Sequence, residues 1–201
     1  MGFILLLLAI VLCLWSKKDI HIFINNRYNT FFDYFFKVFT VLGDGIFVAA
    51  VAVAFIFISV RKAFFIGLSG VFAGIIAQFF KKIVFPSVLR PKAYFKDIYE
   101  LHFIQGVNVH SYNSFPSGHT TSAFALFIVL AYLAPKKWMK IVALVAALLV
   151  AYSRMYLSQH FLIDVYFGSI FGIISGLLGI YLMSKPQNYW IDKSIQKIIF
   201  K

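Results

Sequence analysis

Six apolar runs separated by polar connections are the strongest constraint on how this chain can fold. The runs are residues 3–15, 41–60, 63–80, 120–133, 141–152 and 165–183. Because a helix needs about 20 apolar residues to cross the core of a bilayer, the three shortest runs must continue into polar, protein-facing stretches at one end. The pattern predicts an all-α fold, a polytopic membrane helical bundle of about six transmembrane helices.

Composition also favours a membrane protein over a soluble one. Of the 201 residues, 62% are hydrophobic, 13% are charged and 25 are Phe, which is too apolar for a soluble globule of this size. The first run resembles a signal-peptide core, but it lacks a preceding basic stretch and a following cleavage site, so we interpret it as a retained span. The only cysteine, Cys13, excludes an intrachain disulfide.

The connections between the apolar runs predict a single domain and one segment that mixes apolar and polar residues. We find no repeat, and the longest polar connection, residues 81–118, is too short to fold alone, so residues 1–201 are expected to form a single integral membrane domain. Between the first two runs, residues 20–39 mix Phe and Ile with Asn, Arg and Asp. Such a segment is typical of an interfacial helix after the first span, and an ordinary amphipathic connector is an equal alternative.

The formal net charge of +12 does not indicate a nucleic-acid partner. Many basic residues flank the apolar runs, as charges that anchor spans at a membrane surface do. They are Arg61, Lys62, Lys136, Lys137, Lys140 and Lys185. We therefore expect membrane lipids, and no nucleic acid, as partners.

Three short polar clusters stand at the ends of apolar runs. The first is Lys82 with Arg90-Pro91, the second is the hexapeptide from Ser114 to His119, and the third is Ser153-Arg154, His160 and Asp164. With six spans, the connections after the third and fifth spans lie on the same side of the membrane. The three clusters are therefore predicted to meet on one face.

The second cluster is typical of an anion site at the start of a helix. Pro116 suits the first turn of a helix, and Gly118 lets a ligand approach the backbone closely. The free N–H groups at that helix end attract a phosphate oxygen. His119 beside them can protonate a leaving oxygen, which a simple loop-to-helix turn would not require.

The third cluster predicts a nucleophile. His160 and Asp164 are four residues apart and share one face of a helix, so the carboxylate can orient the imidazole and leave its other nitrogen free to attack. Asp164 leads directly into an apolar run, where an ionisable group is costly without a purpose. Metal ligation by His119, His160 and Asp164 is the alternative, but nearby cations would repel a metal ion.

Three cations complete the predicted site. Arg90 and Arg154 offer planar donors for bidentate contact with phosphoryl oxygens, and Lys82 adds a point charge. Each alone could be a side chain that reaches from a span end to the membrane surface. Their convergence with two histidines on one face favours a phosphate site.

The three clusters together resemble the signature of the type 2 phosphatidic acid phosphatase (PAP2) family, whose site is shared with vanadium haloperoxidases. One spacing departs from the family pattern. The family usually places six residues between Lys and Arg-Pro, whereas seven separate Lys82 from Arg90. One extra residue turns a helix by about 100°, so either the segment unwinds near Pro86 or Lys81 takes the role.

The resemblance implies a membrane lipid phosphatase that needs neither metal nor cofactor. His160 would attack phosphorus and form a phosphohistidine, Asp164 would orient it, and His119 would protonate the leaving oxygen. The phosphate-binding set would be Lys82, Arg90, Ser117, Gly118 and Arg154. The substrate would be phosphatidic acid, phosphatidylglycerol phosphate, a polyprenyl diphosphate or a lipid A phosphate.

Two other classes of function remain open from the sequence. A lipid phosphotransferase would share this site and differ in what attacks the phosphohistidine. A transporter would also place charges at helix ends, but it usually shows repeats or broken helices, which we do not find. Together with the resemblance to the family, the small size of the chain and the lack of an extra domain imply a bacterial inner-membrane setting. The short basic loops at Arg61-Lys62 and Lys136-Lys137 favour the cytoplasmic side, which predicts that the site faces outward.

Overall fold

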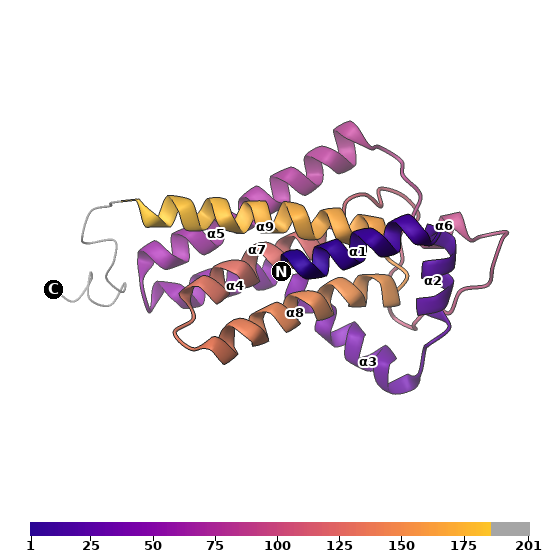
Figure 1. The fold of residues 1–201 in the computed structure, drawn as a ribbon, viewed down its shortest axis with the longest axis horizontal. Helices are drawn as coiled ribbons and strands as arrows, with labels where there is room; N and C mark the ends of the chain where they lie inside the picture. Colours follow the sequence, from indigo (N-terminus) through magenta and orange to yellow (C-terminus); the bar gives the residue numbers. More distant parts are fainter. Residues whose placement is uncertain (186–201) are drawn as a thin grey trace.

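The computed structural model describes residues 1–185, and these residues form helices and loops without strands (Figure 1). The helices are α1 (Gly2–Leu14), α2 (Lys17–Asn25), α3 (Thr30–Phe39), η1 (Thr40–Gly43), α4 (Gly45–Ile56), α5 (Val60–Phe79), η2 (Phe80–Val84), α6 (Pro91–Tyr94), α7 (Gly118–Leu133), α8 (Lys137–Tyr156) and α9 (Leu162–Ser184). The predicted all-α class is confirmed.

Each of the six apolar runs forms a helix. Three continuous helices in the described part of the chain are long and apolar enough to cross a membrane: Val60–Val84, Lys137–Tyr156 and Leu162–Ser184. A fourth span passes the same test only as the pair Thr30–Gly43 and Gly45–Ile56, which is bent by 58°. The helices α1 and α7 are apolar but shorter. The run at 141–152 gains its length as expected, because α8 begins at the polar Lys137.

Helix α7 lies at the centre of the bundle, between α5, α8 and α9. Its side chains Ala123, Phe124 and Val129 are almost fully buried. Helix α9 approaches α7 closely because α9 carries Gly at the contact: a Cβ on Gly172 would lie 2.5 Å from the carbonyl oxygen of Thr121. This close packing brings the start of α9 next to the start of α7.

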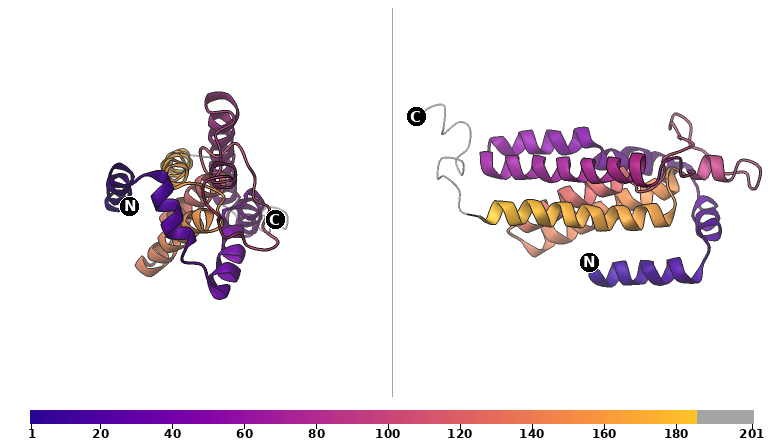
Figure 2. Two further views of the ribbon diagram at one scale, coloured as in Figure 1. Left: turned by 90° about the vertical axis from the view of Figure 1, so that its right-hand side faces the viewer. Right: turned by 90° about the horizontal axis from the view of Figure 1, so that it is seen from above.

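The first two helices pack outside this core. Helix α1 runs alongside the bundle near α9 (Figure 2), where Leu8 and Val11 pack against the apolar core. Helix α2 then crosses the end of the bundle. The segment 20–39 is therefore not one interfacial helix but parts of α2 and α3, separated by a turn in which the Asn29 side chain caps α3 by accepting from the N–H of Phe32.

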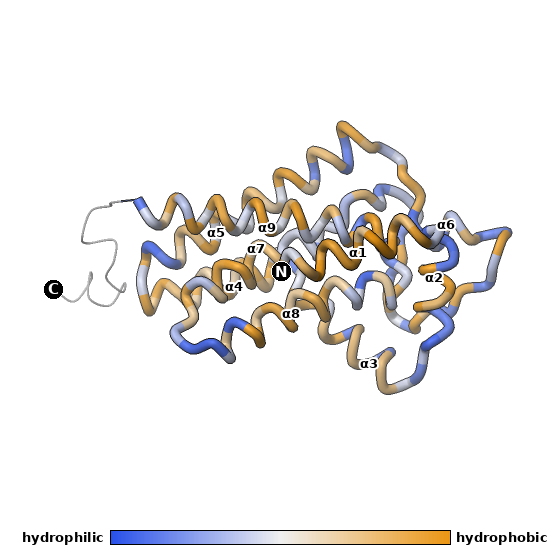
Figure 3. Tube along the Cα trace, in the orientation of Figure 1, coloured by the Kyte–Doolittle hydropathy of each residue, from blue (hydrophilic) through white to orange (hydrophobic). Residues whose placement is uncertain are grey.

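Polar residues gather at the two ends of the bundle, and apolar residues cover its middle (Figure 3). The long connection between η2 and α7 lies at the same end as α2 and the short connection between α8 and α9. The prediction that these two connections share one face is confirmed.

Candidate active site

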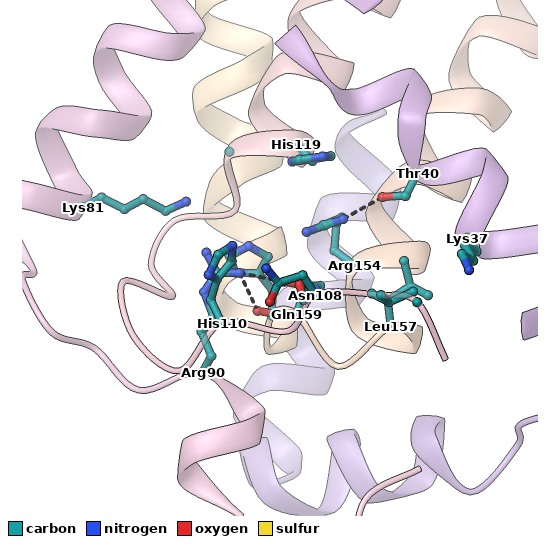
Figure 4. Close-up of a pocket in the computed structure, with 14 residues that line it drawn as sticks. Lys37, Thr40, Lys81, Arg90, Asn108, His110, His119, Arg154, Leu157 and Gln159 are labelled. Carbon is teal, nitrogen blue, oxygen red and sulfur yellow. Dashed lines mark hydrogen bonds between the residues drawn. The ribbon is translucent and has the colours of Figure 1, made fainter. Parts of the chain in front are cut away.

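A cavity of about 470 Å³ opens at this end of the bundle (Figure 4). Five of the eight site residues predicted from the sequence line it: Arg90, Gly118, His119, Arg154 and His160. Further residues, which the sequence did not single out, also line it: Lys37, Thr40, Gly106, Val107, Asn108, His110, Leu157 and Gln159. Lys81 completes the lining. The other three predicted residues, Asp164, Ser117 and Lys82, lie outside the lining of the cavity.

Asp164 lies directly behind His160, and both side chains are only 2% exposed. The Oδ2 atom of Asp164 is 3.5 Å from Nδ1 of His160. The same oxygen accepts hydrogen bonds from the hydroxyl of Ser114 at 2.5 Å and from the N–H of Phe161 at 2.9 Å. Ser114 Oγ is also 3.5 Å from His160 Nδ1. The carboxylate is thus held by two donors beside Nδ1 of His160, and His160 lines the cavity.

The turn that carries His160 follows from how α8 ends. Ser158 adopts a left-handed backbone conformation with φ of 52°. This reverses the chain, so that the N–H groups of Gln159 and His160 both bond to the carbonyl of Arg154, at 3.0 and 3.1 Å. Such bonds satisfy carbonyls at the end of a helix. The five residues between Arg154 and His160 therefore form a closed turn that sets the two side chains side by side.

Helix α2 supports this turn from the outside. The Asn25 side chain donates to Ser158 Oγ at 3.2 Å and pairs with the backbone of His102 at 3.0 and 2.9 Å. Nε2 of His21 lies 3.2 Å from the same Ser158 hydroxyl, and burial lowers the pKa of His21 to about 4. His21 stacks on Phe95 with ring centroids 5.5 Å apart. The turn is therefore fixed between α2 and the long connection.

The start of α7 forms the opposite wall of the cavity. Ser117 is the N-cap of α7, and its hydroxyl accepts from the backbone N–H and the hydroxyl of Thr120. Its own N–H donates to the carbonyl of Asp164 at 3.0 Å, which ties α7 to α9. Ser117 is fully buried and lies beneath the cavity rather than on its wall. Its predicted contact with phosphate stays a prediction, whereas its capping role is visible.

Lys81, and not Lys82, lines the cavity. Residues spaced by four share a face of a helix, and Lys81 follows Ala73 and Ala77, which are 0% and 4% exposed. Lys82 instead continues the exposed face of α5. The placement of Lys82 in the site is therefore corrected to Lys81, the alternative that the spacing had raised. The ammonium of Lys81 lies 3.6 Å from the point where a Cβ of Gly118 would stand.

The helical geometry changes at the lysine pair, which lies inside a π-helical turn. Residues Phe80–Val84 form a π-helical turn, closed by a bond from the N–H of Phe85 to the carbonyl of Phe80 at 2.8 Å. A π turn holds an extra residue. The chain thereby accommodates the longer spacing between its lysine and Arg90 without moving Lys81 away from α7.

Arg90 is 7% exposed and is fixed by neutral acceptors. Its Nε donates to the carbonyl of Tyr112 at 2.9 Å, and one terminal nitrogen donates to Oε1 of Gln159 at 2.9 Å. Gln159 in turn donates to the carbonyl of Asn108 at 2.8 Å. Burial lowers the pKa of Arg90, and the Asp164 carboxylate opposes that shift. Gln159 thus joins the long connection to the turn that carries His160.

The bend between η1 and α4 contributes two residues that the sequence did not identify. Thr40 accepts a hydrogen bond from a terminal nitrogen of Arg154 at 2.7 Å. Asp44 caps α4 and places its Oδ2 atom 3.9 Å from Nε2 of His119. Gly43 permits this approach, because a Cβ there would lie 2.8 Å from the carbonyl oxygen of His119.

The electrostatics of the cavity favour an anion. Among residues 1–185, no carboxylate oxygen lies within 4 Å of Lys81, Arg90 or Arg154 in an ion pair. The buried Nε of Arg154 has no hydrogen-bond partner within that range. In the described part of the chain, no group of three His, Cys, Asp or Glu residues could hold a metal ion. Buried cations without counter-ions are costly, and a bound phosphoryl group would compensate them.

The same surroundings keep His160 in its neutral form. Burial is the largest cause that lowers the pKa of His160 well below its usual value, and Arg90, Lys81 and Arg154 lower it further. A neutral imidazole with an oriented Nδ1 is a competent nucleophile.

Comparisons with known proteins agree with this geometry. A family model described as the PAP2 superfamily matches residues 62–188. The structure resembles LpxE from Aquifex aeolicus with a TM-score of 0.72 and 26% sequence identity, over 81% of this chain and 93% of that one. It also resembles the first transmembrane PAP2 type phosphatidylglycerolphosphate phosphatase from Bacillus subtilis, with a TM-score of 0.65 and 24% identity, over 94% of this chain and 96% of the other. A comparison of this sequence with curated proteins found no match.

Proposed function

Because this chain belongs to the PAP2 superfamily, we propose that it is an integral membrane phosphatase that hydrolyses a phosphate monoester or diphosphate of a lipid. The observation that carries the proposal is the cavity itself. Three cations that have no carboxylate partner among residues 1–185, Lys81, Arg90 and Arg154, line the cavity together with His160. The cavity lies at an end of apolar helices, where the headgroup of a membrane lipid would present its phosphate.

The proposed reaction has two steps. Nε2 of His160 attacks phosphorus, the bond between phosphorus and the lipid oxygen breaks, and His119 donates a proton to that oxygen. Water then attacks the phosphohistidine, gives a proton back to His119, and releases inorganic phosphate while His160 is restored. Asp44, 3.9 Å from His119, would stabilise its protonated form. Asp164 would stabilise the charge that develops on His160.

The fixed cations would take the role that metal ions play in many phosphoryl-transfer enzymes. Charge in the transition state spreads over the equatorial oxygens of the phosphoryl group, and donors already placed around those oxygens stabilise it without reorganisation. Lys81, Arg90, Arg154 and the N–H of Gly118 would supply these donors. The proposed reaction is therefore independent of a metal ion.

Phosphate release from a lipid phosphate by the purified protein tests the function and separates hydrolysis from transfer to another acceptor. We expect release by the wild-type protein and none by His160→Ala. Quenching with alkaline detergent during turnover with a ³²P-labelled lipid should trap a base-stable, acid-labile phosphoenzyme in the wild-type protein and none in His160→Ala. Substantial turnover by His160→Ala would refute the mechanism, and a lack of release from every lipid phosphate would refute the function.

We further propose a bacterial inner membrane with the site facing outward. The support is the basic short loops Arg61-Lys62 and Lys136-Lys137, at the end of the bundle opposite the cavity. Single cysteines in a Cys13→Ser background test this orientation. An impermeant maleimide should label position 108 in intact cells and leave position 137 unlabelled, and the reverse pattern would contradict the orientation.

A further inference from the structure

Lys37 is a cation of the cavity that the proposed reaction does not use. It stands in the last turn of α3, and its ammonium lines the same cavity as His160. In Figure 4, Lys37 and Lys81 lie on opposite sides of the cavity, and Arg154 lies between them. The cavity therefore extends from the phosphate site toward a second positive charge.

Lys37 is held in place by the long connection. Its Nζ donates to the carbonyl of Gln105 at 2.9 Å. The next residue, Gly106, has a φ of 75°, and a Cβ there would lie 2.8 Å from the same Nζ. Glycine at this position thus allows the loop to pack directly on the ammonium. An ammonium has three protons, so this single bond leaves two of them for a ligand.

The charge of the cavity exceeds what one phosphoryl group would compensate. Of the residues that the structure describes, four Lys and Arg side chains line it, Lys37, Lys81, Arg90 and Arg154, and no Asp or Glu does so. A phosphate monoester carries at most two negative charges near neutral pH. Asp44 does not line the cavity, and its Oδ2 atom lies 3.9 Å from Nε2 of His119, a distance typical of a weak ion pair. One or two positive charges therefore remain for a further anionic group.

The volume of the cavity also exceeds one phosphoryl group. Its 470 Å³ equals the space of roughly fifteen water molecules in the liquid, at about 30 Å³ each. A phosphoryl group has only five heavy atoms. Leu157 and Gly106 also line the cavity, and Gly106 packs against the ammonium of Lys37.

We propose that Lys37 forms a second anion site, which binds a further phosphate group of the same lipid while His160 attacks the first. The preferred substrates would then be lipids with two phosphate groups in the headgroup. The two groups could be joined directly, as in a diphosphate, or through a short polyol. This inference deepens the proposed function and rests on it.

Phosphate-release kinetics on three lipids with identical acyl chains test the proposal. The lipids are phosphatidic acid with one phosphate, diacylglycerol diphosphate with two adjacent phosphates, and phosphatidylglycerol phosphate with two phosphates joined by glycerol. For Lys37→Met we expect KM to rise about tenfold or more for at least one of the two-phosphate lipids, as loss of a charged hydrogen bond predicts. We expect kcat for that lipid, and KM for phosphatidic acid, to change by less than about twofold. The lipid that responds identifies how the two phosphates are joined.

Matched variants separate a binding site from a general effect of charge. Lys96→Met removes an exposed cation from the same end of the molecule without touching the cavity, and it should leave all three KM values unchanged. Lys37→Arg keeps the charge and should retain most of the selectivity.

An equal rise of KM for all three lipids, or no change for any of them, would overturn the second anion site while the phosphatase activity stands. A wild-type protein that releases phosphate from none of them would instead overturn the proposed function, and the second site with it.

Discussion

Adjacent lysines at the end of α5 offer a sharp test of the site, because only one of them reaches it. Lys81 and Lys82 carry the same charge and differ by one position, but only Lys81 lines the cavity. Its ammonium lies 3.6 Å from the point where a Cβ of Gly118 would stand. A phosphoryl group bound at the start of α7 would therefore be within reach of Lys81 and not of Lys82.

The expected magnitudes follow from this placement. A hydrogen bond to a charged group contributes about 1.5–3 kcal/mol, and 1.36 kcal/mol corresponds to a tenfold change in rate. Lys81→Ala should therefore lower kcat/KM by roughly 10-fold to 150-fold. Lys82→Ala removes an exposed charge and should lower kcat/KM by less than about threefold.

Initial rates of phosphate release from one lipid substrate, measured on purified proteins in the same detergent, provide the comparison. Size-exclusion profiles and thermal unfolding should match among wild type and both variants, so that the difference reports on the site. A larger loss for Lys82→Ala than for Lys81→Ala would refute the placement of Lys81. Equal losses would show that only the general charge of this region matters.

Three further predictions concern the chemistry of the site. Asp164→Asn should lower kcat by several orders of magnitude, and Ser114→Ala by less, because Asp164 retains its bond from Phe161 when the Ser114 hydroxyl is removed; comparable losses in single-turnover rates would contradict this ranking. Activity should survive excess EDTA and be inhibited by vanadate, which mimics the geometry of the transition state; loss on chelation that a divalent metal restores would favour a metal site. The acidic limb of the kcat/KM profile should lie below pH 6.5, the ordinary pKa of histidine, because burial and nearby cations favour neutral His160. In the proposed mechanism neutral His160 attacks, so the acidic limb appears where pH drops through its lowered pKa, whereas the need for protonated His119 lowers activity at higher pH. A midpoint of the acidic limb above 6.5, after correction for ionisation of the substrate, would contradict this environment.

Much of the site could be predicted from the sequence because its residues stand in short segments of regular structure. The four-residue spacing predicted that His160 and Asp164 share a helix face; the two side chains do meet, but His160 stands in the turn before α9 and only Asp164 lies on the helix. The order and charge of the clusters place Arg90, His119 and Arg154 on the same face. The choice between Lys81 and Lys82 depended on helical phase. The buried Ala73 and Ala77 mark the side of α5 that faces the protein. The sequence alone does not show which side of this apolar helix faces the protein, so it did not distinguish the two lysines.

Other site residues could not be predicted because only tertiary packing brings them in. Thr40 and Asp44 precede the first cluster by about 40 residues, and the bend after η1 carries them to Arg154 and His119. Gln159 lies between two predicted residues, but its contacts with Arg90 depend on a turn with a left-handed Ser158. Ser117 was predicted from its motif, and its capping bond with Thr120 is visible only once α7 is placed.

The support that α2 gives to the turn at Ser158 bears on where the functional unit of this protein begins. The family model matches residues 62–188, yet Asn25, Thr40 and Asp44 contact the catalytic turn or the side chains beside it. A chimaera that transplants only the matched segment onto a foreign N-terminal half would inherit His160, the proposed nucleophile, without the residues that support its turn. Grafts of this site should therefore start before α2 and include α2, α3, η1 and α4.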